Sequence, residues 1–561
     1  MNIRKLLALT LAVVMLASVA LADWTSEDYA AAAKVVKTSY AGKTVILHSN
    51  DVHGALTGYA YMAALKKQFE AAGAEVVLVD AGDFSQGTTY VSDSKGASAV
   101  DMMNAAGYDV VTLGNHEFDF GYAQLMANLE KAEFTVICAD VILDATGEPI
   151  LPAACLLTTE SGLKLGFFGM ETPETATKVN PGMISEISFC TFGDLYTAAQ
   201  KAVDTLKAEE ADLVIGLTHL GVDAESAANG YRSVDLLAKV EGIDFTIDGH
   251  SHTVMTAGEN GEAIQSTGTK FENIGVVVID NETKAIEDNF LLATAGITPD
   301  ADVLAKAQAY VDEVEAKYGA VFATSEVRLN GDRDPGNRTE ETNLGDLIVD
   351  AMVWSVVKEG GIEQVEPNHV VGITNGGGIR ATIEAGDITM NDINTVLPFG
   401  NTVAVVYVTG AELLEALEAS TFSTPTAIGG YPQTSGIEWT IDTTVPFDQG
   451  EIYSLNGKEG SYYGPASIKR VTITAINGEP FDVNAVYAVV TNNFCAAGGD
   501  TYNVFARSES SFDTGIPMDQ TVMDYITDVL NGVITEAAYG APSGRETQIR
   551  EEVTEEVAPA A

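Results

Sequence analysis

The stretch LGNHEFDFG, residues 113–121, places an amide, an imidazole and two carboxylates directly after the apolar run Tyr108–Gly114. A short apolar run of this kind is typical of a buried strand. A loop that follows such a strand and carries Asn115, His116 and Asp119 collects metal-ligand and acid–base side chains in one place. We therefore expect the partners of these residues at the ends of other strands.

The chain from Lys43 to about Thr294 alternates strand-like apolar runs with amphipathic helical stretches. This alternation predicts a layered α/β domain whose polar motifs lie at the carboxyl ends of the strands, where ligands bind in such folds. A linking helix is predicted over 299–324, starting near Pro299. A second α/β unit is predicted over 325–541, and the acidic remainder, 542–561, is predicted to be disordered.

Length and the N-terminal segment narrow the class of protein. A chain of 561 residues is too long for one hydrophobic core, so two large domains are expected. Residues 1–22 have a basic start, an apolar middle and a small-residue end, which is the pattern of a secretory signal peptide cleaved after Ala22. The apolar run is shorter than the ~20 residues that a membrane span needs. We expect a secreted or periplasmic protein without a stable membrane anchor.

Charge and cysteine content constrain partners and redox state. The formal net charge is −50, which makes nucleic acid and anionic lipid poor partners and makes any basic residue in a cleft noteworthy. Four cysteines in an exported chain allow three pairings, and the sequence does not choose among them. These residues are Cys138, Cys155, Cys190 and Cys495.

Histidine is concentrated in the strand-end motifs, which hold five of the seven histidines. Imidazole, carboxylate and amide ligands without thiolate suit Zn, Mn, Co or Fe ions. Seven candidate ligands are more than one ion uses, and they suit two ions that share a carboxylate. His116 is then left as a proton donor or charge stabiliser, with Asp119 fixing its tautomer. The candidate ligands are Asp51, His53, Asp83, Asn115, His219, His250 and His252. Glu117 is expected to support the site, and His48 and His369 are expected to be structural.

The motif order NDVHG, GDFSQG, GNHEFDFG, THLG and GHSHT resembles the calcineurin-like metallophosphoesterases. Together with the second unit, the chain resembles the bacterial secreted 5′-nucleotidase/UDP-sugar hydrolase family. This resemblance implies a four-layer αββα metallophosphoesterase domain followed by a smaller α/β substrate-binding domain. It also implies His116 and Asp119 as the catalytic dyad. One ion is implied at Asp51, His53, Asp83 and His252, and the other at Asp83, Asn115, His219 and His250.

The second unit contains candidate residues for a nucleotide. The glycine-rich turn NGGGIR, from Asn375 to Arg380, brings backbone close to a ligand and ends in a cation suited to phosphate. The resemblance implies that Phe399 and Phe494 stack on the base and that Asp500 binds the ribose. In this chain Thr501 replaces the usual glycine of that loop. Asn401 and Arg338 complete the expected substrate-binding set, and a third arginine that some relatives have is not located.

The function implied is hydrolysis of nucleoside 5′-monophosphates, and also of nucleotide pyrophosphates such as UDP-sugars. Two alternatives stay open: a 2′,3′-cyclic-nucleotide phosphodiesterase/3′-nucleotidase, and an exported nucleotide- or metal-binding protein without turnover. The cyclic enzymes usually read NHEFNYG where this chain reads NHEFDFG. We expect the site in an interdomain cleft that opens by a hinge between Lys317 and Arg328.

Overall fold

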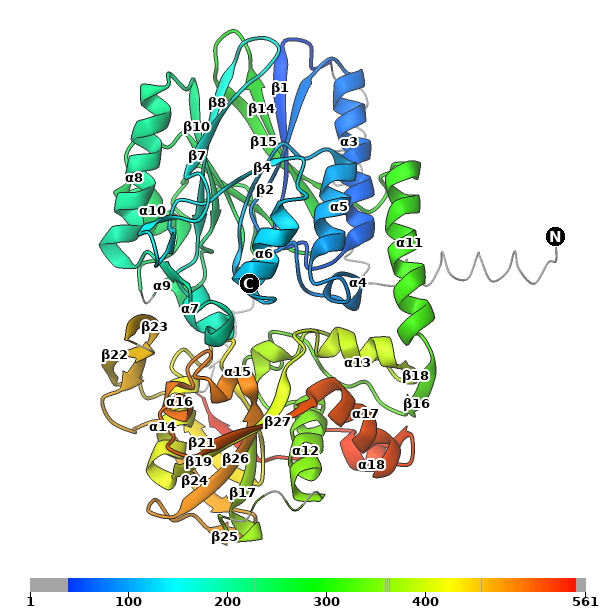
Figure 1. Ribbon diagram of the computed structural model, residues 1–561, viewed down its shortest axis with the longest axis vertical. Coiled ribbons are helices and arrows are strands. Elements are labelled where there is room, and N and C mark those ends of the chain that lie inside the picture. Colours follow the sequence, from blue (N-terminus) through cyan, green and yellow to red (C-terminus); the bar gives the residue numbers. More distant parts are fainter. Residues whose placement is uncertain are drawn as a thin grey trace, which may run out of the picture.

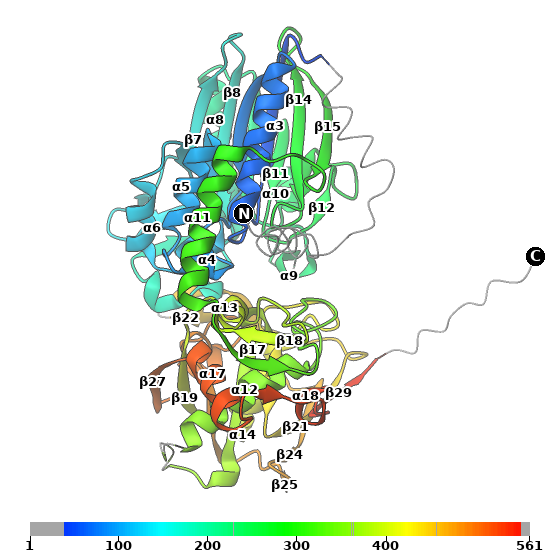
Figure 2. The ribbon, with the colours of Figure 1, turned by 90° about the vertical axis from the view of Figure 1, so that its right-hand side faces the viewer.

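The computed structural model consists of two α/β domains joined by a long helix, α11 (Ala301–Tyr318) (Figures 1 and 2). The structure describes residues 39–550 except 228, 359, 361, 363 and 456. The expected signal peptide lies outside these residues. Within them, no helix combines the length and apolarity needed to cross a bilayer.

Two six-stranded sheets stack face to face in the N-terminal domain. Side chains alternate along β1 (Lys43–Ser49): Ile46 packs between the two sheets, whereas Val45 and Leu47 pack against the helices. The first sheet has the order β15 (Ile286–Ala293), β14 (Asn273–Asp280), β1, β2 (Glu75–Asp80), β3 (Val110–Thr112) and β4 (Thr135–Ile137). The second has the order β12 (Val254–Met255), β13 (Ile264–Thr267), β11 (Phe245–Asp248), β10 (Leu213–His219), β8 (Lys164–Glu171) and β7 (Ala154–Thr158).

Helices cover both outer faces of this sheet pair, which gives the four-layer αββα arrangement implied by the sequence (Figure 1). The first sheet is covered by α3 (Tyr59–Ala71), α5 (Ala97–Ala106) and α6 (Tyr122–Leu129), and the second by α8 (Phe192–Ala208) and α10 (Ser233–Lys239). Shorter elements complete the domain: α4 (Thr89–Ser92), α7 (Thr175–Lys178), α9 (Ala224–Ala227) and the small sheet of β6 (Glu148–Pro149), β5 (Val141–Leu143) and β9 (Ile187–Phe189).

The central strands of both sheets run parallel, from β1 to β4 in one and from β8 through β10 and β11 to β13 in the other. Their carboxyl ends therefore meet at one edge of the domain, and this edge faces the second domain (Figure 1). The polar motifs of the sequence follow these strand ends, which explains why residues far apart in the chain can meet.

The C-terminal domain is built around a five-stranded sheet with a core on each face. Along β26 (Val486–Asn492), Ala488 and Val490 face α12 (Asn343–Lys358) and α17 (Met518–Asp528), whereas Val489 faces α14 (Gly410–Ser420). The sheet order is β20 (Pro432–Ser435), β17 (Val370–Asn375), β26, β19 (Thr402–Thr409) and β27 (Ser511–Pro517). A second sheet has the order β25 (Glu479–Pro480), β24 (Val471–Ile476), β21 (Ile437–Asp442) and β29 (Glu546–Ile549). The remaining elements are α13 (Met390–Val396), α15 (Asn493–Ala496), α16 (Asn503–Ala506), α18 (Glu536–Tyr539), the sheet of β18 (Gly386–Thr389), β16 (Val321–Ser325) and β28 (Val533–Ile534), and the hairpin of β22 (Gln449–Leu455) and β23 (Lys458–Pro465).

The linking helix is shorter than the sequence predicted. Asp300 caps its start by accepting hydrogen bonds from two backbone N–H groups, and Gly319 follows its last residue. The prediction of helix through residue 324 is wrong, because 321–325 form β16 and pair with β18 and β28. The second domain therefore begins four residues earlier than predicted.

The prediction of disorder from residue 542 is wrong for 546–549, which form β29 and pair in parallel with β21. Arg545 places this strand: its guanidinium lies 2.8 Å from the Asp350 carboxylate and 3.2 Å from that of Asp346. These contacts and the strand ladder offset the entropic cost of ordering a polar segment. Residues 551–561 lie outside the described part of the chain.

Candidate active site

The backbone at the strand ends is strained where the predicted metal ligands lie. Asp51, His53, Asp83, His250 and His252 all have positive φ, between 45° and 76°. This region is sparsely populated by residues other than glycine, and such strain gathers at functional sites where the surrounding structure enforces it. The loops after β1, β2 and β11 thus fix the backbone positions from which these five side chains extend.

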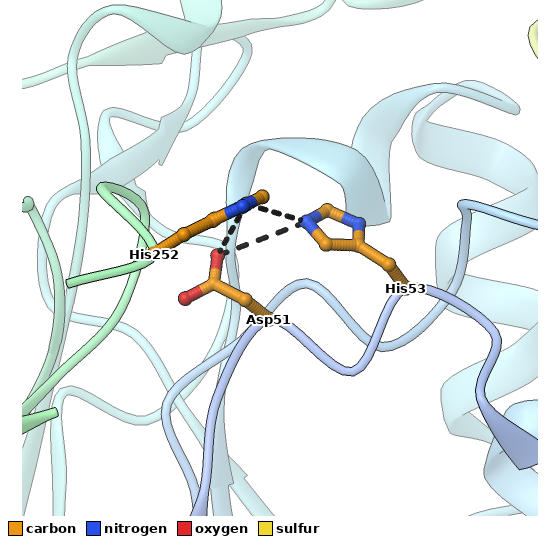
Figure 3. A group of neighbouring side chains, drawn as sticks. All are labelled: Asp51, His53 and His252. Carbon is orange, nitrogen blue, oxygen red and sulfur yellow. Dashed lines mark hydrogen bonds and ion pairs between the residues drawn. The ribbon is translucent and has the colours of Figure 1, made fainter. Parts of the chain in front are cut away.

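Three of the predicted ligands meet in one cluster, formed by Asp51, His53 and His252 (Figure 3). The Nε2 atoms of the two histidines lie 2.9 Å apart, and the Asp51 Oδ1 atom lies 3.8 Å from His53 Nε2 and 3.5 Å from His252 Nε2. Burial lowers the pKa of His53 and of His252, so both rings are neutral. Neutral imidazole is the form that binds metal ions.

The four remaining predicted ligands lie in two pairs, Asp83 with His219 and Asn115 with His250. His219 Nε2 lies 3.1 Å from Asp83 Oδ2, and His219 Nδ1 lies 2.6 Å from the carbonyl oxygen of Ala81. Burial opposes a charge on this ring, but the carboxylates of Asp83 and Asp51 outweigh it and raise the pKa of His219. With Nδ1 donating to the Ala81 carbonyl, the neutral ring presents its Nε2 lone pair to a cation. His250 Nδ1 lies 3.0 Å from the side-chain oxygen of Asn115. Asp83 also lies 3.7 Å from His53, so its pair adjoins the cluster of Asp51, His53 and His252.

The seven predicted ligands have the chemistry and the surroundings of a binding site for divalent cations. The Nε2 atom of His219 and the carboxylate of Asp83 face each other at 3.1 Å in a fully buried setting, an arrangement that suits a cation bound to both. Burial raises the pKa of Asp51 to about 6, and a cation would restore its charged form. Imidazole, carboxylate and amide oxygen with no thiolate form a donor set for Zn, Mn, Co or Fe ions. The described side chains therefore provide two adjacent candidate metal sites that meet at Asp83.

The predicted dyad is formed in the structure. His116 Nδ1 lies 2.7 Å from Asp119 Oδ2, so the carboxylate accepts the Nδ1–H hydrogen bond and leaves Nε2 directed at the cluster. His116 Nε2 is 4.0 Å from Asp83 Oδ2, and the His116 backbone N–H donates to Asp83 Oδ1 at 2.9 Å. An imidazole held in this way can exchange a proton with a ligand bound beside Asp83.

Glu117 connects two of the loops that carry the predicted ligands by hydrogen bonds. Its carboxylate accepts hydrogen bonds from the backbone N–H groups of Asp83, Phe84 and Ser85 after β2, and from that of Gly114 after β3. The side chain is 2% exposed, and both of its oxygens accept from these backbone N–H groups. This placement agrees with a supporting role. His48 lies apart from the clusters, buried against Gln265.

One cavity between the domains brings both sets of predicted residues together. It is lined from the N-terminal domain by Asp83, Asn115, His116, Asp119, His250 and His252, and from the C-terminal domain by Arg338, Asn375, Arg380, Phe399, Asn401, Phe494 and Asp500. Every predicted substrate-binding residue therefore faces the same space as the dyad. Asp51, His53 and His219 lie deeper, beneath this lining.

Local packing explains how the second domain holds its part of the cavity. A Cβ on Gly376 would lie 1.8 Å from the carbonyl oxygen of Asn337, so the turn before Arg380 requires glycine there. Asn375 Nδ2 donates to Asp500 Oδ2 at 2.9 Å and fixes that carboxylate toward the cavity. Asp500 takes up the left-handed backbone conformation of this loop, with φ 48°. The loop therefore forms with threonine at position 501, where relatives usually have glycine.

Sequence reasoning missed four polar residues of the site. Arg333, Lys178 and Asn180 line the cavity, and Glu174 lies beneath it, 3.2 Å from His250 Nε2. Arg333 lies five residues before Arg338 in the same loop, so basic spacing was an available signal. Glu174 follows β8 as the other motifs follow their strands, but the segment METPE contains no histidine to mark it.

The four cysteines form no disulfide with one another, and the buried Cys495 donates from Sγ to the side-chain oxygen of Asn375 at 3.4 Å. Burial raises the pKa of Cys155 to about 11 and that of Cys190 to about 12, which makes both poor nucleophiles. The open question of pairing is thereby answered for this structure.

Family models match both domains. Residues 44–254 match the calcineurin-like phosphoesterases, and residues 321–507 match the 5′-nucleotidase C-terminal domain. The second match begins at the first residue of β16, in agreement with the corrected domain boundary.

The chain is similar to several known proteins over most of its length. The chain is 30% identical over 84% of its length to the trifunctional nucleotide phosphoesterase protein YfkN of Bacillus subtilis, but it spans only 33% of that protein. It is 27% identical to a 5′-nucleotidase of Vibrio cholerae, covering 86% of this chain and 90% of the relative. The crystal structure of a 5′-nucleotidase precursor from Thermus thermophilus, 28% identical, superposes with a TM-score of 0.74 and covers 91% of this chain and 100% of the other.

Proposed function

We propose that this chain, which belongs to the calcineurin-like phosphoesterases that carry a 5′-nucleotidase C-terminal domain, is an exported enzyme that hydrolyses nucleoside 5′-monophosphates. At the level of the family, it is a metal-dependent phosphoric monoester hydrolase. The finer assignment rests on one observation: a single cavity is lined by the catalytic dyad, by arginines and by two phenylalanines. The relatives in Bacillus subtilis and Vibrio cholerae, a nucleotide phosphoesterase and a 5′-nucleotidase by name, support the same substrate class.

Two metal ions are part of this proposal. One is assigned to Asp51, His53, Asp83 and His252, and the other to Asp83, Asn115, His219 and His250. When bound, such ions stabilise negative charge on phosphoryl oxygens and lower the pKa of water. The protein holds the ligands in place through the strained strand ends and through Glu117. Zn, Mn and Co all suit this donor set, and the residues do not select among them.

The phosphate group lies, in this proposal, between the metal ligands and the cations of the second domain. Arg338 and Arg380 line that side, and Arg333 adds a third guanidinium. Burial lowers the pKa of Arg380, with Arg333 nearby as a further cause, so a bound anion is favoured beside them. His116 stabilises charge on the transferring group or gives a proton to the departing 5′-oxygen, and Asp119 keeps its Nδ1 protonated.

The nucleoside is assigned to the remaining wall of the cavity. Phe399 and Phe494 supply flat apolar faces for a base, and base–aromatic stacking is worth ~1–3 kcal/mol per base. Asp500, held by Asn375, accepts hydrogen bonds from ribose hydroxyls. Asn401 lies in the same lining and can bond the polar edge of the base. These groups distinguish a nucleotide from a simple phosphoester.

Chromatographic analysis of the products formed by purified protein tests this function, because opening a cyclic phosphodiester or a pyrophosphate releases no free phosphate. AMP, 2′,3′-cyclic AMP and UDP-glucose are compared with and without a chelator. We expect hydrolysis of AMP that is lost in chelator and restored by Mn²⁺ or Co²⁺, with slower turnover of the cyclic nucleotide. Preference for cyclic AMP would favour the phosphodiesterase alternative, and AMP binding without turnover in any metal would favour a binding protein. UDP-glucose reports on the pyrophosphate activity.

A further inference from the structure

Glu174 is a buried carboxylate that the reaction outlined above does not use. It caps the start of α7, directly after β8, and its side chain is 1% exposed. Its Oε2 atom lies 3.2 Å from His250 Nε2 and 3.5 Å from Lys178 Nζ. Burying a carboxylate is costly without such partners. The side chain therefore stands between a predicted metal ligand and a cation of the substrate cavity.

The hydrogen-bond pattern around His250 gives Glu174 a role. A carboxylate only accepts, so the proton of the contact belongs to His250 Nε2, and in the neutral ring that binds metal Nδ1 carries the lone pair. That Nδ1 atom faces the side-chain oxygen of Asn115 at 3.0 Å. Two acceptors at this distance repel each other unless a cation binds both. Glu174 thus sets the tautomer in which His250 can join Asn115 on a metal ion.

Lys178 stabilises the negative charge of the buried Glu174 carboxylate. Its ammonium group lies within ion-pair distance of Glu174, and its side chain is 11% exposed. A charged carboxylate accepts a stronger hydrogen bond than a neutral group and makes the opposite ring nitrogen more basic. The backbone at His250, with φ 76°, does not orient the ring by itself, because rotation about the side-chain bonds remains.

We propose that Glu174 is a positioning residue that orients His250, through its Nε2–H, toward the metal site shared with Asn115. This inference rests on the proposed two-metal function and deepens it. It differs from a purely structural role, because it predicts weakened binding at one metal site only. Loss of a hydrogen-bonding partner behind a metal ligand typically costs ~10- to 100-fold in metal affinity.

The test is calorimetric titration of chelator-treated full-length protein with Co²⁺. Wild type should bind two ions. Glu174→Gln should bind one of them ~10- to 100-fold more weakly and the other unchanged. The matched control is Glu418→Gln, since Glu418 is also fully buried but accepts backbone N–H groups of Arg470 and Val471, far from the site. It should lose stability without a change in either Co²⁺ affinity.

A second measurement does not depend on the variant's folding. The chain has seven histidines, so selective ¹⁵N-histidine labelling of the Zn²⁺-loaded wild type gives a simple NMR spectrum. His250, assigned by its absence in His250→Ala, should show a protonated Nε2 and a metal-bound Nδ1. A protonated Nδ1, or equal Co²⁺ affinities in wild type and Glu174→Gln, would overturn the inference while leaving the proposed function intact. Wild-type protein that binds no Co²⁺ would overturn both.

Discussion

Replacing Phe399 with alanine should lower kcat/KM for a nucleotide more than kcat/KM for a phosphate ester without a base. The ring lines the interdomain cavity, is half-buried, and lies near two other groups of the site. Its centroid is 5.6 Å from that of His116 at an interplanar angle of 28°, and the Arg380 guanidinium lies 5.8 Å from it. Loss of the ring therefore removes a base-stacking face and also disturbs the dyad and one phosphate cation.

The two effects separate when AMP is compared with ribose 5-phosphate, which has no base. Disturbance of His116 or Arg380 should affect both substrates equally. Loss of stacking, ~1–3 kcal/mol per base, should lower kcat/KM for AMP by a further ~5- to 150-fold at ~1.4 kcal/mol per decade. The assay is steady-state phosphate release for both substrates. An unchanged ratio of the two kcat/KM values would refute the assignment of Phe399 to the base.

Four further outcomes are expected. Asp119→Ala should lower kcat at least ~100-fold with little change in KM, because His116 loses the acceptor that fixes its tautomer. Equal changes in both constants would argue against this role. His252→Ala should retain one metal ion by elemental analysis instead of two. A disulfide engineered between positions 229 and 461, whose residues are hydrogen-bonded across the domain interface, should stop multiple turnover until it is reduced; normal turnover in the cross-linked protein would exclude a required opening. Arg545→Met should lower the unfolding free energy by ~1–3 kcal/mol in chemical denaturation, because it leaves buried Asp346 without its cation.

The sequence predicted the first domain and the ligand clusters well because both follow from short-range patterns. Apolar runs such as the one before Asn115 mark buried strands, and parallel strands bring their carboxyl ends together without any knowledge of long-range contacts. The histidines at those ends could be collected by type alone. Their roles as ligands are still a proposal, but the structure brings the seven side chains, Asp83 among them, together in adjoining clusters at the strand ends.

Features that depend on tertiary contacts were not predictable in the same way. β29 has the sequence ETQI, which looks like part of a polar tail, and it is ordered by its pairing with β21 and by the ion pairs of Arg545. Apolar residues continue beyond Gly319, so the sequence alone does not show where the helix that begins after Pro299 ends. The next segment forms a strand because it pairs with β18. Glu174 becomes notable only when His250, 76 residues later, is placed beside it.

The central claim is that two metal ions and the nucleotide-binding groups act in one interdomain cavity. The most direct test is the rate of phosphate release from AMP by chelator-treated protein as Co²⁺ is added in known equivalents. The account predicts negligible release without metal and a rise that levels off at two equivalents per chain. Full activity in excess chelator, or a rate that is already maximal at one equivalent, would contradict it.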